Sequence, residues 1–495
     1  MLLESGPGGT SISRISNRYL DELSMKKKAV QWVLGILVVL FALTAALLCP
    51  PLFSKPYVPY DVLAELEATA PPMEEGSWPL VVEAIDRLPE LPWQDMLDDH
   101  SSEADRQEFE RWLLDNQDLI ELLREAGSRA HWGQPYRPVA YEQSRLDYYE
   151  RTGDLEQAAA TRARMASLSE VVSPWEIRVS RLIDLHPLAN LLALSARRAS
   201  AEGRRMDSLL DLEAAFGLGR QLSKKRSGVI DYMIGRALER TGGEEFRRLL
   251  SEHAADWTPE ELERLAHSPF CTAKQASLAE VVDGEYKISL SMVDFLFAEG
   301  FSDWEQLIRL DGSSSSGLED LARYLGHYLV EGREETLERL ELKHAHLLKL
   351  EHVARHERGR FEDLPESIMP RGLLADFRSP LVGHLMPPNI YRSLTNMLED
   401  ARLEVEVHRL ALALIEWRQA EGQYPESLIE LVPRYLEFLP IDPCDGRPIR
   451  YRKVDGEVRV YSVSHSHGLD GGNTEDEGGV SPDDRLFLKF QAVED

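Results

Sequence analysis

The sequence predicts a mainly α-helical protein with a single N-terminal transmembrane helix and a small C-terminal α+β module. Three observations support this. An apolar segment without a charged residue lies near the N-terminus. Apolar residues then recur at three- and four-residue spacing through the middle of the chain. The last part of the chain changes to short alternating runs with turn residues between them, which is typical of strands.

The length and charge of the chain restrict its organisation and its partners. At 495 residues it exceeds what one hydrophobic core usually supports, so we expect more than one structural unit. The formal net charge is -29, with a sequence pI near 5.0. Such an acidic chain is a poor ligand for nucleic acid or for anionic lipid surfaces, because like charges repel. We therefore expect no nucleic-acid partner.

Residues 29–49 form the apolar segment, and as a helix they span roughly 30 Å, the thickness of the hydrocarbon core. Residues 1–28 carry five Lys/Arg against three Asp/Glu, whereas the residues after 49 carry 51 against 82. The positive-inside rule therefore places the tail 1–28 in the cytosol and the main domain outside, in the periplasm if the membrane is a bacterial inner membrane. The alternative is a signal peptide that begins at Met25 and is later cleaved from the protein. A lipoprotein is disfavoured because Leu48 precedes Cys49, where a small residue is expected.

Residues 50–61 are rich in proline, which opposes helix formation, so we expect an extended stalk. The region 62–387 has the helical pattern. Gly153, Gly203 and the Gly242-Gly243 pair each look like a helix end followed by a new helix, as helical hairpins require. Residues 146–168 resemble one tetratricopeptide (TPR) hairpin. The chain shows no strict 34-residue period, so the prediction is an irregular, TPR-like stack of helical hairpins.

Residues 388–495 form the predicted C-terminal module. A long helical pattern begins at Pro388 and ends at Gly422, and a short capped helix is expected over 426–436. Strands are expected over 447–453 and 457–463, joined by Asp455-Gly456, a strong hairpin signal. A third strand, over 485–490, completes a three-stranded antiparallel sheet. A loop rich in glycine and acidic residues, 467–484, precedes it.

The order of motifs in this module resembles the globular part of the major pseudopilin of bacterial type II secretion. In that family a helix ends in Gly-x-Tyr-Pro and leads to a Leu-Pro-x-Asp-Pro turn, an antiparallel sheet and a calcium-binding loop after a Tyr-Ser pair. The matching residues here are Ala411, Leu412, Gly422, Tyr424, Pro425, Leu439, Pro440, Asp442, Pro443, Gly446, Tyr451, Tyr461, Ser462, Gly468, Asp470, Gly471, Asp483 and Asp484. The resemblance covers about a fifth of the chain.

The chain also departs from the pseudopilin pattern. We expect no peptidase-cleaved leader, the segment 29–49 has no acidic residue, and roughly 340 residues separate that segment from the module. We therefore do not expect a filament subunit. The whole chain resembles uncharacterised bacterial membrane-anchored proteins that place this module after a helical domain.

The resemblance implies a calcium site in the acidic loop, because calcium takes six to eight oxygen ligands, several of them carboxylates. The candidate ligands are Asp470, Asp476, Asp483 and Asp484, with Asn473 as a further oxygen donor. The alternative is a solvated acidic loop that holds no metal.

Other candidate chemistry is weak. His344, His346, Glu351, His352 and His356 are expected on one helix, where His352 and His356 would share a face, but a third ligand is missing there. A helix with this many charged side chains usually exposes them to solvent and binds no metal.

His465 and His467 flank Ser466, although alternate residues of an extended segment do not place a base beside a nucleophile. Cys271 and Cys444 either form a bridge or stay as two buried thiols, and the second state is favoured. The chain has no phosphate-binding loop, no Gly-x-Ser-x-Gly and no His-Glu-x-x-His motif.

The sequence thus favours a non-enzymatic interaction or scaffold protein of the bacterial envelope, whose helical domain binds an envelope partner protein. The first alternative is a hydrolase with carboxylates brought together from distant helices, and paired carboxylates of different pKa would identify it. The second is an accessory component of a secretion or pilus system, which the C-terminal resemblance suggests.

Overall fold

The structure is a computed structural model, and it describes most of the chain after residue 60. The described residues are 61–89, 96, 102–168, 182–224, 228–299, 333–358, 388–454, 457–463 and 485–491. The predicted membrane helix 29–49, the stalk up to residue 60 and the acidic loop lie outside them. Within the described residues, no helix is both long enough and apolar enough to cross a bilayer.

The chain divides into two compact units. The larger comprises Tyr60–Met292, Leu337–Met369 and Leu385–Asp495, and the smaller comprises Met1–Pro59, Val293–Thr336 and Pro370–His384. In the smaller unit, Arg333 donates a hydrogen bond to Asp294 at 2.7 Å.

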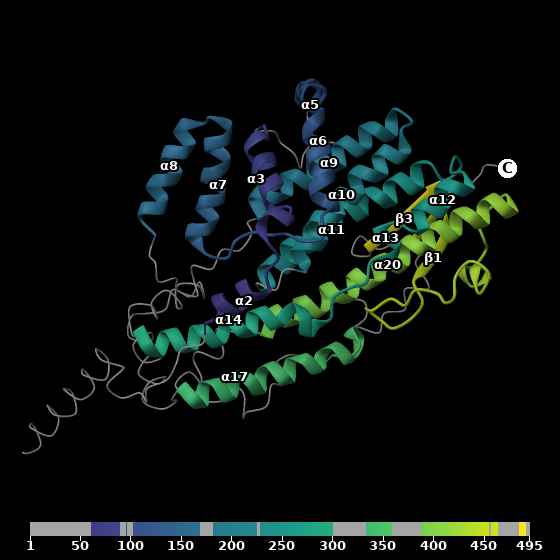
Figure 1. Ribbon diagram of the computed structural model, residues 1–495. Helices are drawn as coiled ribbons and strands as arrows, with labels where there is room; N and C mark the ends of the chain where they lie inside the picture. Colours follow the sequence, from purple (N-terminus) through teal and green to yellow (C-terminus); the bar gives the residue numbers. More distant parts are fainter. Residues whose placement is uncertain are drawn as a thin grey trace, which may run out of the picture. The chain divides into compact units, whose positions relative to one another are not determined.

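Helices make up most of the described structure, as predicted (Figure 1). The first α-helices are α2 (Val62–Thr69), α3 (Trp78–Arg87), α5 (Glu103–Asp115), α6 (Gln117–Ser128), α7 (Pro138–Thr152), α8 (Leu155–Ala166), α9 (Leu182–Ala201), α10 (Arg205–Ser223) and α11 (Val229–Glu252). They are followed by α12 (Pro259–Ala266), α13 (Pro269–Thr272), α14 (Leu278–Glu299), α17 (Arg333–Leu348) and α20 (Pro388–Glu421). The short 3-10 helices are η2 (Met73–Glu75), η4 (Lys349–His352), η5 (Arg355–Glu357) and η7 (Leu428–Leu431).

Two of the predicted hairpin turns are confirmed. Gly153 ends α7 with φ +82° and its N–H bonds to the carbonyl of Tyr149, after which Asp154 caps α8. Gly203 has φ +78° between α9 and α10. Glycine adopts this left-handed conformation without a steric penalty, which explains both helix ends. Ala158, expected at the close-packed position of α8, is fully buried.

The third predicted turn was wrong. Gly242 and Gly243 lie inside α11, which continues from Val229 to Glu252. A Cβ at Gly242 would approach the backbone of α10 to 3.2 Å at the carbonyl of Leu212, so a small residue is needed where the two helices pack. Gly242 therefore serves helix packing, and neither glycine forms a turn.

Glycines also mark a very close contact between the backbones of α10 and α11. A Cβ at Gly219 would lie 2.5 Å from the carbonyl oxygen of Gly235, and a Cβ at Gly235 would lie 2.6 Å from the carbonyl oxygen of Gly219. Real Cβ atoms do not approach so closely, so only glycine at both positions permits this backbone contact.

The hydrophobic core has two main parts. The first joins α3, α5, α6, α7, α9 and one face of α10, around residues such as Trp78, Leu119 and Leu192. The second comprises residues of α10, α11, α12, α13 and α20 together with the C-terminal sheet. At its centre the rings of Phe246 and Phe270 stack with centroids 4.3 Å apart. Because α10 contributes to both parts, it connects the two cores.

The C-terminal sheet has the predicted three antiparallel strands in the order β1 (Arg450–Val454), β2 (Glu457–Ser462) and β3 (Arg485–Gln491). In the β1–β2 pair, Tyr451 lies opposite Val460, and the β2–β3 register shifts between Val460 and Tyr461. Strand β1 begins later than predicted because Pro448, which has no N–H, forms only an isolated bridge with Ile441.

The capped helix predicted over 426–436 is only partly correct. Ser427 and Glu430 form the expected reciprocal capping box, but the helix is the single 3-10 turn η7. Pro433 explains the early end, because it has no N–H to donate and its ring clashes with a preceding carbonyl.

The turn between α20 and the sheet is held by Asp442, which is fully buried. Its carboxylate accepts hydrogen bonds of 2.9 Å from the N–H of Cys444, the hydroxyl of Ser462 and the N–H of Val463. The Leu-Pro-x-Asp-Pro turn and the Tyr-Ser pair of the sequence thus meet at this side chain.

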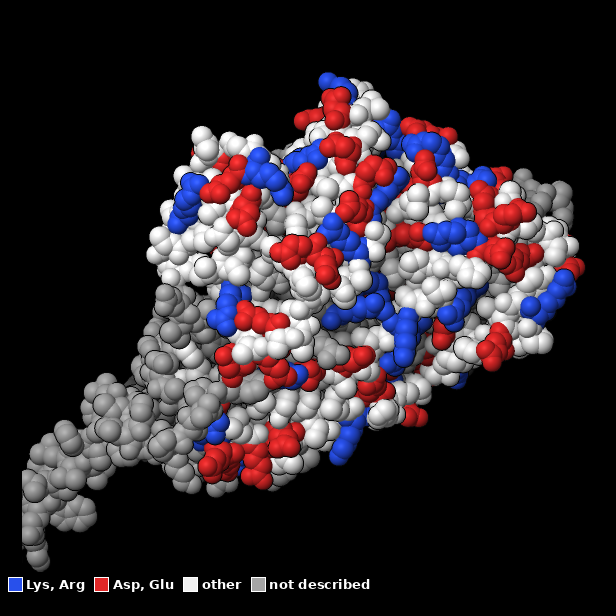
Figure 2. Space-filling view, viewed as in Figure 1, with Lys and Arg blue, Asp and Glu red and all other residues white. Residues whose placement is uncertain are grey.

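Charged side chains of both signs are interspersed over the face shown in Figure 2. Many form local pairs, such as Arg240 with Glu244 and Arg248 with Glu252, each at 2.6 Å. Exposed pairs of this kind add little stability. They do show that many arginines of the described surface have acidic neighbours, so cations that lack such neighbours are informative.

Candidate functional site

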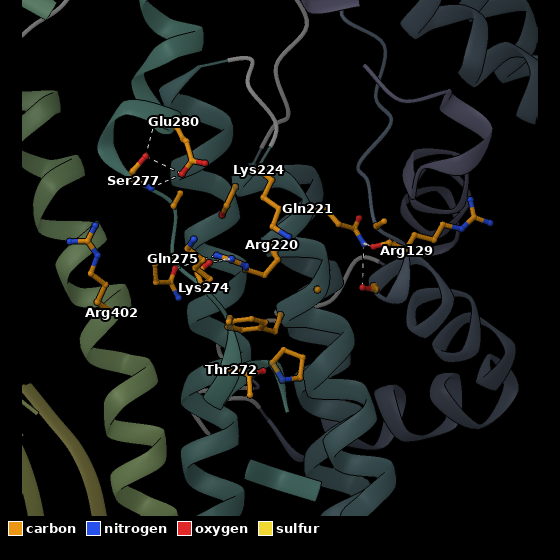
Figure 3. A pocket seen from close by; sticks show the side chains of 18 of the residues that line it. Arg129, Arg220, Gln221, Lys224, Thr272, Lys274, Gln275, Ser277, Glu280 and Arg402 are labelled. Carbon is orange, nitrogen blue, oxygen red and sulfur yellow. Dashed lines mark hydrogen bonds between the residues drawn. The ribbon is translucent and has the colours of Figure 1, made fainter. Parts of the chain in front are cut away.

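A cavity of about 1180 Å³ lies where four segments of the larger unit meet. These are the end of α6, the C-terminal half of α10, the residues 267–280 around α13 and the start of α14, and α20. We call it the basic cleft. Figure 3 shows side chains of α10 and of the α13–α14 connection next to one another, with Arg129 and Arg402 on opposite sides.

The lining is strongly positive although the chain is strongly negative. Five Lys or Arg side chains and one carboxylate line the basic cleft. The cations are Arg129, Arg220, Lys224, Lys274 and Arg402, and the carboxylate is Glu280. With a net charge of -29 for the whole chain, this local excess attracts anions.

The carboxylate of Glu280 accepts hydrogen bonds from Ser277 at the start of its own helix. Ser277 donates its N–H to Glu280 at 2.8 Å and its hydroxyl at 3.0 Å, and the N–H of Glu280 donates to the hydroxyl of Ser277 at 3.2 Å. This capping box begins α14 at the edge of the basic cleft. The one carboxylate of the lining therefore serves the helix end.

Arg220 connects α10 to the segment between α13 and α14. Its guanidinium donates to the carbonyl oxygen of Lys274 and, at 3.2 Å, to the side-chain oxygen of Gln275. This fixes the path of residues 273–277, which are not helical. Arg220 thus keeps its positive charge beside the cavity while it positions Lys274.

Gln221 holds the opposite wall. Its buried amide donates to the carbonyl oxygens of Ala126, Gly127 and Arg129 at 2.8, 3.2 and 2.7 Å, and it accepts from the hydroxyl of Ser77 at 2.6 Å. The last carbonyls of a helix have no partner within the helix, so Gln221 satisfies the end of α6. The backbone that carries Arg129 is therefore fixed.

The five cations differ in whether they already form an ion pair with a carboxylate. Arg129 pairs with Glu125 at 2.7 Å and Arg402 with Glu351 at 2.8 Å. Lys224 and Lys274 are exposed, and no described residue forms a hydrogen bond or ion pair with either ammonium group. These two lysines are the charges that a bound anion would meet first.

Asp470, Asp476, Asp483 and Asp484 lie outside the described residues, as do His465 and His467. Within the described part of the chain, no group of three or more His, Cys, Asp or Glu residues is arranged to hold a metal ion. The calcium site stays a prediction.

The histidine helix was predicted wrongly. α17 ends at Leu348, and His352 and His356 lie in the separate 3-10 helices η4 and η5. Val353 has an extended backbone, so the two histidines do not share a helix face. His344 instead stacks on the ring of Tyr286, with centroids 4.2 Å apart, and burial lowers its pKa.

Cys271 and Cys444 are separate buried thiols in the structure. Burial raises the pKa of both. Thiols that stay protonated are poor nucleophiles, so neither is a reactive cysteine in this state.

Sequence reasoning missed the basic cleft, because its residues are spread from Gly127 to Arg402. The run Lys224-Lys225-Arg226 was a usable signal, since it is a concentration of positive charge in an acidic chain. Its relation to Lys274 and Arg402 required the tertiary structure.

Comparison with known proteins gave no match to a protein family, to a curated protein or to a solved structure. The fold and the cleft are therefore interpreted from their own geometry and chemistry.

Proposed function

We propose that this chain is a membrane-anchored interaction protein of the bacterial envelope, and that its basic cleft binds an acidic segment of a partner protein. The single observation that supports the binding role is the excess of cations lining the cleft, where Lys224 and Lys274 are exposed and pair with no described residue, in a chain of net charge -29. The apolar residues 29–49 and the preceding lysines support the anchor and its orientation.

The cleft suits a peptide segment better than a small metabolite. Its volume of about 1180 Å³ is above the roughly 300–1000 Å³ of most small-molecule pockets. Its cations come from four segments of the chain, so an extended ligand would meet charge along its length. Nucleic acid is disfavoured as the anion, because the rest of the molecule would repel a polyanion of that length.

The helical hairpins support the same role. The α7–α8 hairpin with Gly153 at its turn and Ala158 at the close contact is similar to a TPR hairpin, and stacked hairpins form broad binding surfaces. The hydrolase alternative has less support. Burial raises the pKa of Glu406 and Glu416, which line a smaller cavity, but ten residues of α20 place them roughly 15 Å apart along the helix.

The test uses the full-length chain in detergent with a fluorescein-labelled deca-glutamate peptide as the probe. We expect binding measured by fluorescence anisotropy to weaken as salt is raised, because salt screens exposed charges. The double variant Lys224→Glu/Lys274→Glu should weaken it by at least about 10-fold, a loss of roughly 1.4 kcal/mol.

The matched control changes the same charge elsewhere. Arg151→Glu/Arg434→Glu alters two arginines whose side chains are 65% and 67% exposed and which do not line the cleft. Binding to this control should equal binding to the unmodified chain. An equal loss in both double variants would show a general charge effect, and absence of binding to the unmodified chain would rule out an acidic peptide.

A further inference from the structure

A separate cavity, of about 290 Å³, lies between the C-terminal half of α20 and residues 435–440 of the C-terminal module, and it shares no lining residue with the basic cleft. We call it the apolar cavity. Eight of its twelve lining residues are uncharged, among them Leu412, Leu436 and Phe438. Phe438 is 56% exposed, although phenylalanine is usually buried. Apolar surface left open beside a cavity commonly marks an interaction site.

One wall of the apolar cavity is a single side of α20. Four lining residues recur at three- and four-residue spacing and therefore share that side: Glu406, Arg409, Ala413 and Glu416. The ten residues between the two carboxylates place them roughly 15 Å apart along the helix. Leu412 and Ala413 lie between them in the sequence. This wall is thus apolar in its middle and has a carboxylate at each end.

The facing wall, residues 435–440, is held in place by the protein itself. The ring of Tyr435 meets the ring of Trp417 on α20 edge to face, with centroids 5.8 Å apart. Further along, the carbonyl oxygen of Pro440 accepts a hydrogen bond of 2.9 Å from the N–H of Ile449. A wall that is already in place loses little conformational freedom when a ligand binds, which favours binding.

The charges at the apolar cavity favour a cationic ligand. Three carboxylates line it, those of Glu406, Glu416 and Glu437, against the one guanidinium of Arg409. That guanidinium donates to the carbonyl oxygen of Cys271 at 2.7 Å and so connects α20 to α13. No described residue forms a hydrogen bond or an ion pair with any of the three carboxylates. They are therefore available to a ligand.

Two of these carboxylates are partly withdrawn from water. Glu406 and Glu416 are half-buried, and burial raises the pKa of both because it removes hydration from the charged form. The positive charge of Arg409 offsets part of this effect at Glu406, and no cation of the described residues offsets it at Glu416. A bound cation replaces the stabilisation that water no longer gives.

We propose that the apolar cavity docks a segment of a partner protein in which one large apolar side chain is flanked on both sides by lysine or arginine. The apolar side chain fills the cavity, whose volume of about 290 Å³ is below the roughly 300–1000 Å³ of most small-molecule pockets. The flanking cations pair with Glu406 and Glu416, whose separation equals about four or five extended residues at roughly 3.3 Å each. This inference does not depend on the acidic segment proposed for the basic cleft.

The experiment titrates two fluorescein-labelled peptides with the full-length chain in detergent at pH 8 and measures fluorescence anisotropy. Lys-Lys-Ser-Phe-Ser-Lys-Lys has the proposed pattern, and Lys-Lys-Ser-Ser-Ser-Lys-Lys keeps the charge without the apolar side chain. We expect the phenylalanine peptide to bind at least about 10-fold more tightly, a difference of roughly 1.4 kcal/mol. Equal binding of the two would show a general attraction of cations to an acidic chain and would overturn the proposal.

The contribution of the carboxylates is tested by Glu406→Gln/Glu416→Gln, which removes both proposed partners of the flanking cations. It should weaken the phenylalanine peptide by about fivefold. The matched control, Glu108→Gln/Glu156→Gln, removes two exposed carboxylates of α5 and α8 that do not line the cavity, and it should leave the affinity unchanged. An equal loss in both double variants, or no loss in the first, would contradict the assignment.

The apolar contact is tested by Phe438→Ser. Because this side chain is 56% exposed, the chain should still fold, and the phenylalanine peptide should lose at least about threefold in affinity while the serine peptide loses none. Leu155→Ser, at a residue 77% exposed on α8, is the matched control and should bind both peptides as the unmodified chain does. Unchanged binding in Phe438→Ser, or an equal loss in Leu155→Ser, would overturn the proposal.

Other occupants of the apolar cavity give different results. Displacement of the phenylalanine peptide by an equimolar amount of phenethylamine would assign the cavity to a small amine. No peptide binding, together with a dimer that Phe438→Ser converts to a monomer in sedimentation velocity, would assign it to a second copy of this chain. Either result, or no binding of the peptide to a monomer, would overturn the proposal.

Discussion

At the scale of single residues, His408 shows how burial sets a charge state. It is 2% exposed on α20, its Nδ1 lies 3.1 Å from the carbonyl oxygen of Phe270, and Arg247 donates to its Nε2 at 3.2 Å. Burial, and to a smaller extent the positive charge of Arg247, lowers the pKa of His408 to about 4. The imidazole is therefore neutral in the folded protein at neutral pH.

This predicts a pH dependence of stability. An unfolded histidine takes up a proton near pH 6.5, whereas the folded His408 does so only near pH 4. Between these values the unfolded state binds more protons, so the free energy of unfolding should fall as the pH falls, by about 3 kcal/mol in total. Above pH 6.5 this contribution is fully present.

Denaturant unfolding of the full-length chain at pH 7.5, 6 and 5 measures the effect. The free energy of unfolding should depend less steeply on pH in His408→Gln, because glutamine keeps a hydrogen-bond donor and an acceptor but does not titrate. The control His267→Gln changes an exposed histidine and should keep the original slope. Equal slopes in all three proteins would contradict the prediction.

The acidic loop gives a second prediction at this scale. If it binds calcium as the pseudopilin resemblance implies, calorimetric titration of the full-length chain with calcium should show binding that Asp483→Ala and Asp484→Ala each weaken, because each removes a carboxylate ligand. Asp118→Ala, an exposed carboxylate on α6, is the matched control. Absence of binding would leave the loop as a solvated acidic segment.

At the scale of elements, the sequence predicted the helical character of the main region, the α7–α8 hairpin and all three strands because their signals are local. Each of these signals determines the conformation of only a few neighbouring residues. They are the apolar spacing, the helix-ending glycines Gly153 and Gly203, and the hairpin signal Asp455-Gly456. Gly242 was predicted wrongly because it is needed for contact with α10 and not for a turn. The helix predicted over 426–436 is only the 3-10 turn η7, because Pro433 stops it. The basic cleft could not be predicted, since its cations meet only after α10, α13 and α20 have packed.

The α10–α11 crossing provides the prediction at this scale. Gly235→Ala should lower the free energy of unfolding by about 1–3 kcal/mol, because the added Cβ would lie 2.6 Å from the backbone oxygen of Gly219 and the helices must separate. Thermal or denaturant unfolding measures the loss.

The matched control lies in the same helix. A Cβ at Gly243 would approach His408 only to 3.5 Å, an ordinary contact, so Gly243→Ala should be neutral or stabilising by up to about 1 kcal/mol. Equal destabilisation by both substitutions would show that glycine is needed throughout this part of α11 for a reason other than the crossing.

At the scale of the whole molecule, the proposed anchor is the property to test. Deletion of residues 29–49 should move the protein from the membrane fraction to the soluble fraction, because the deletion removes the predicted membrane-spanning segment. Cell fractionation and immunoblotting measure the change. Deletion of residues 2–21, which leaves Lys26–Lys28 and the apolar segment in place, is the control and should stay in the membrane. Membrane retention after loss of 29–49 would contradict the single-anchor proposal.

The shared core has a consequence for how this protein is made. Strand β3, from Arg485 to Gln491, contributes Phe487, Leu488 and Phe490 to the same core as Phe246. A ribosome that has released α11 still has more than two hundred residues to add before that core can close. Nascent chains and products truncated before β3 should therefore present an open apolar surface to chaperones and proteases, and the last strand acts as a completeness check on synthesis.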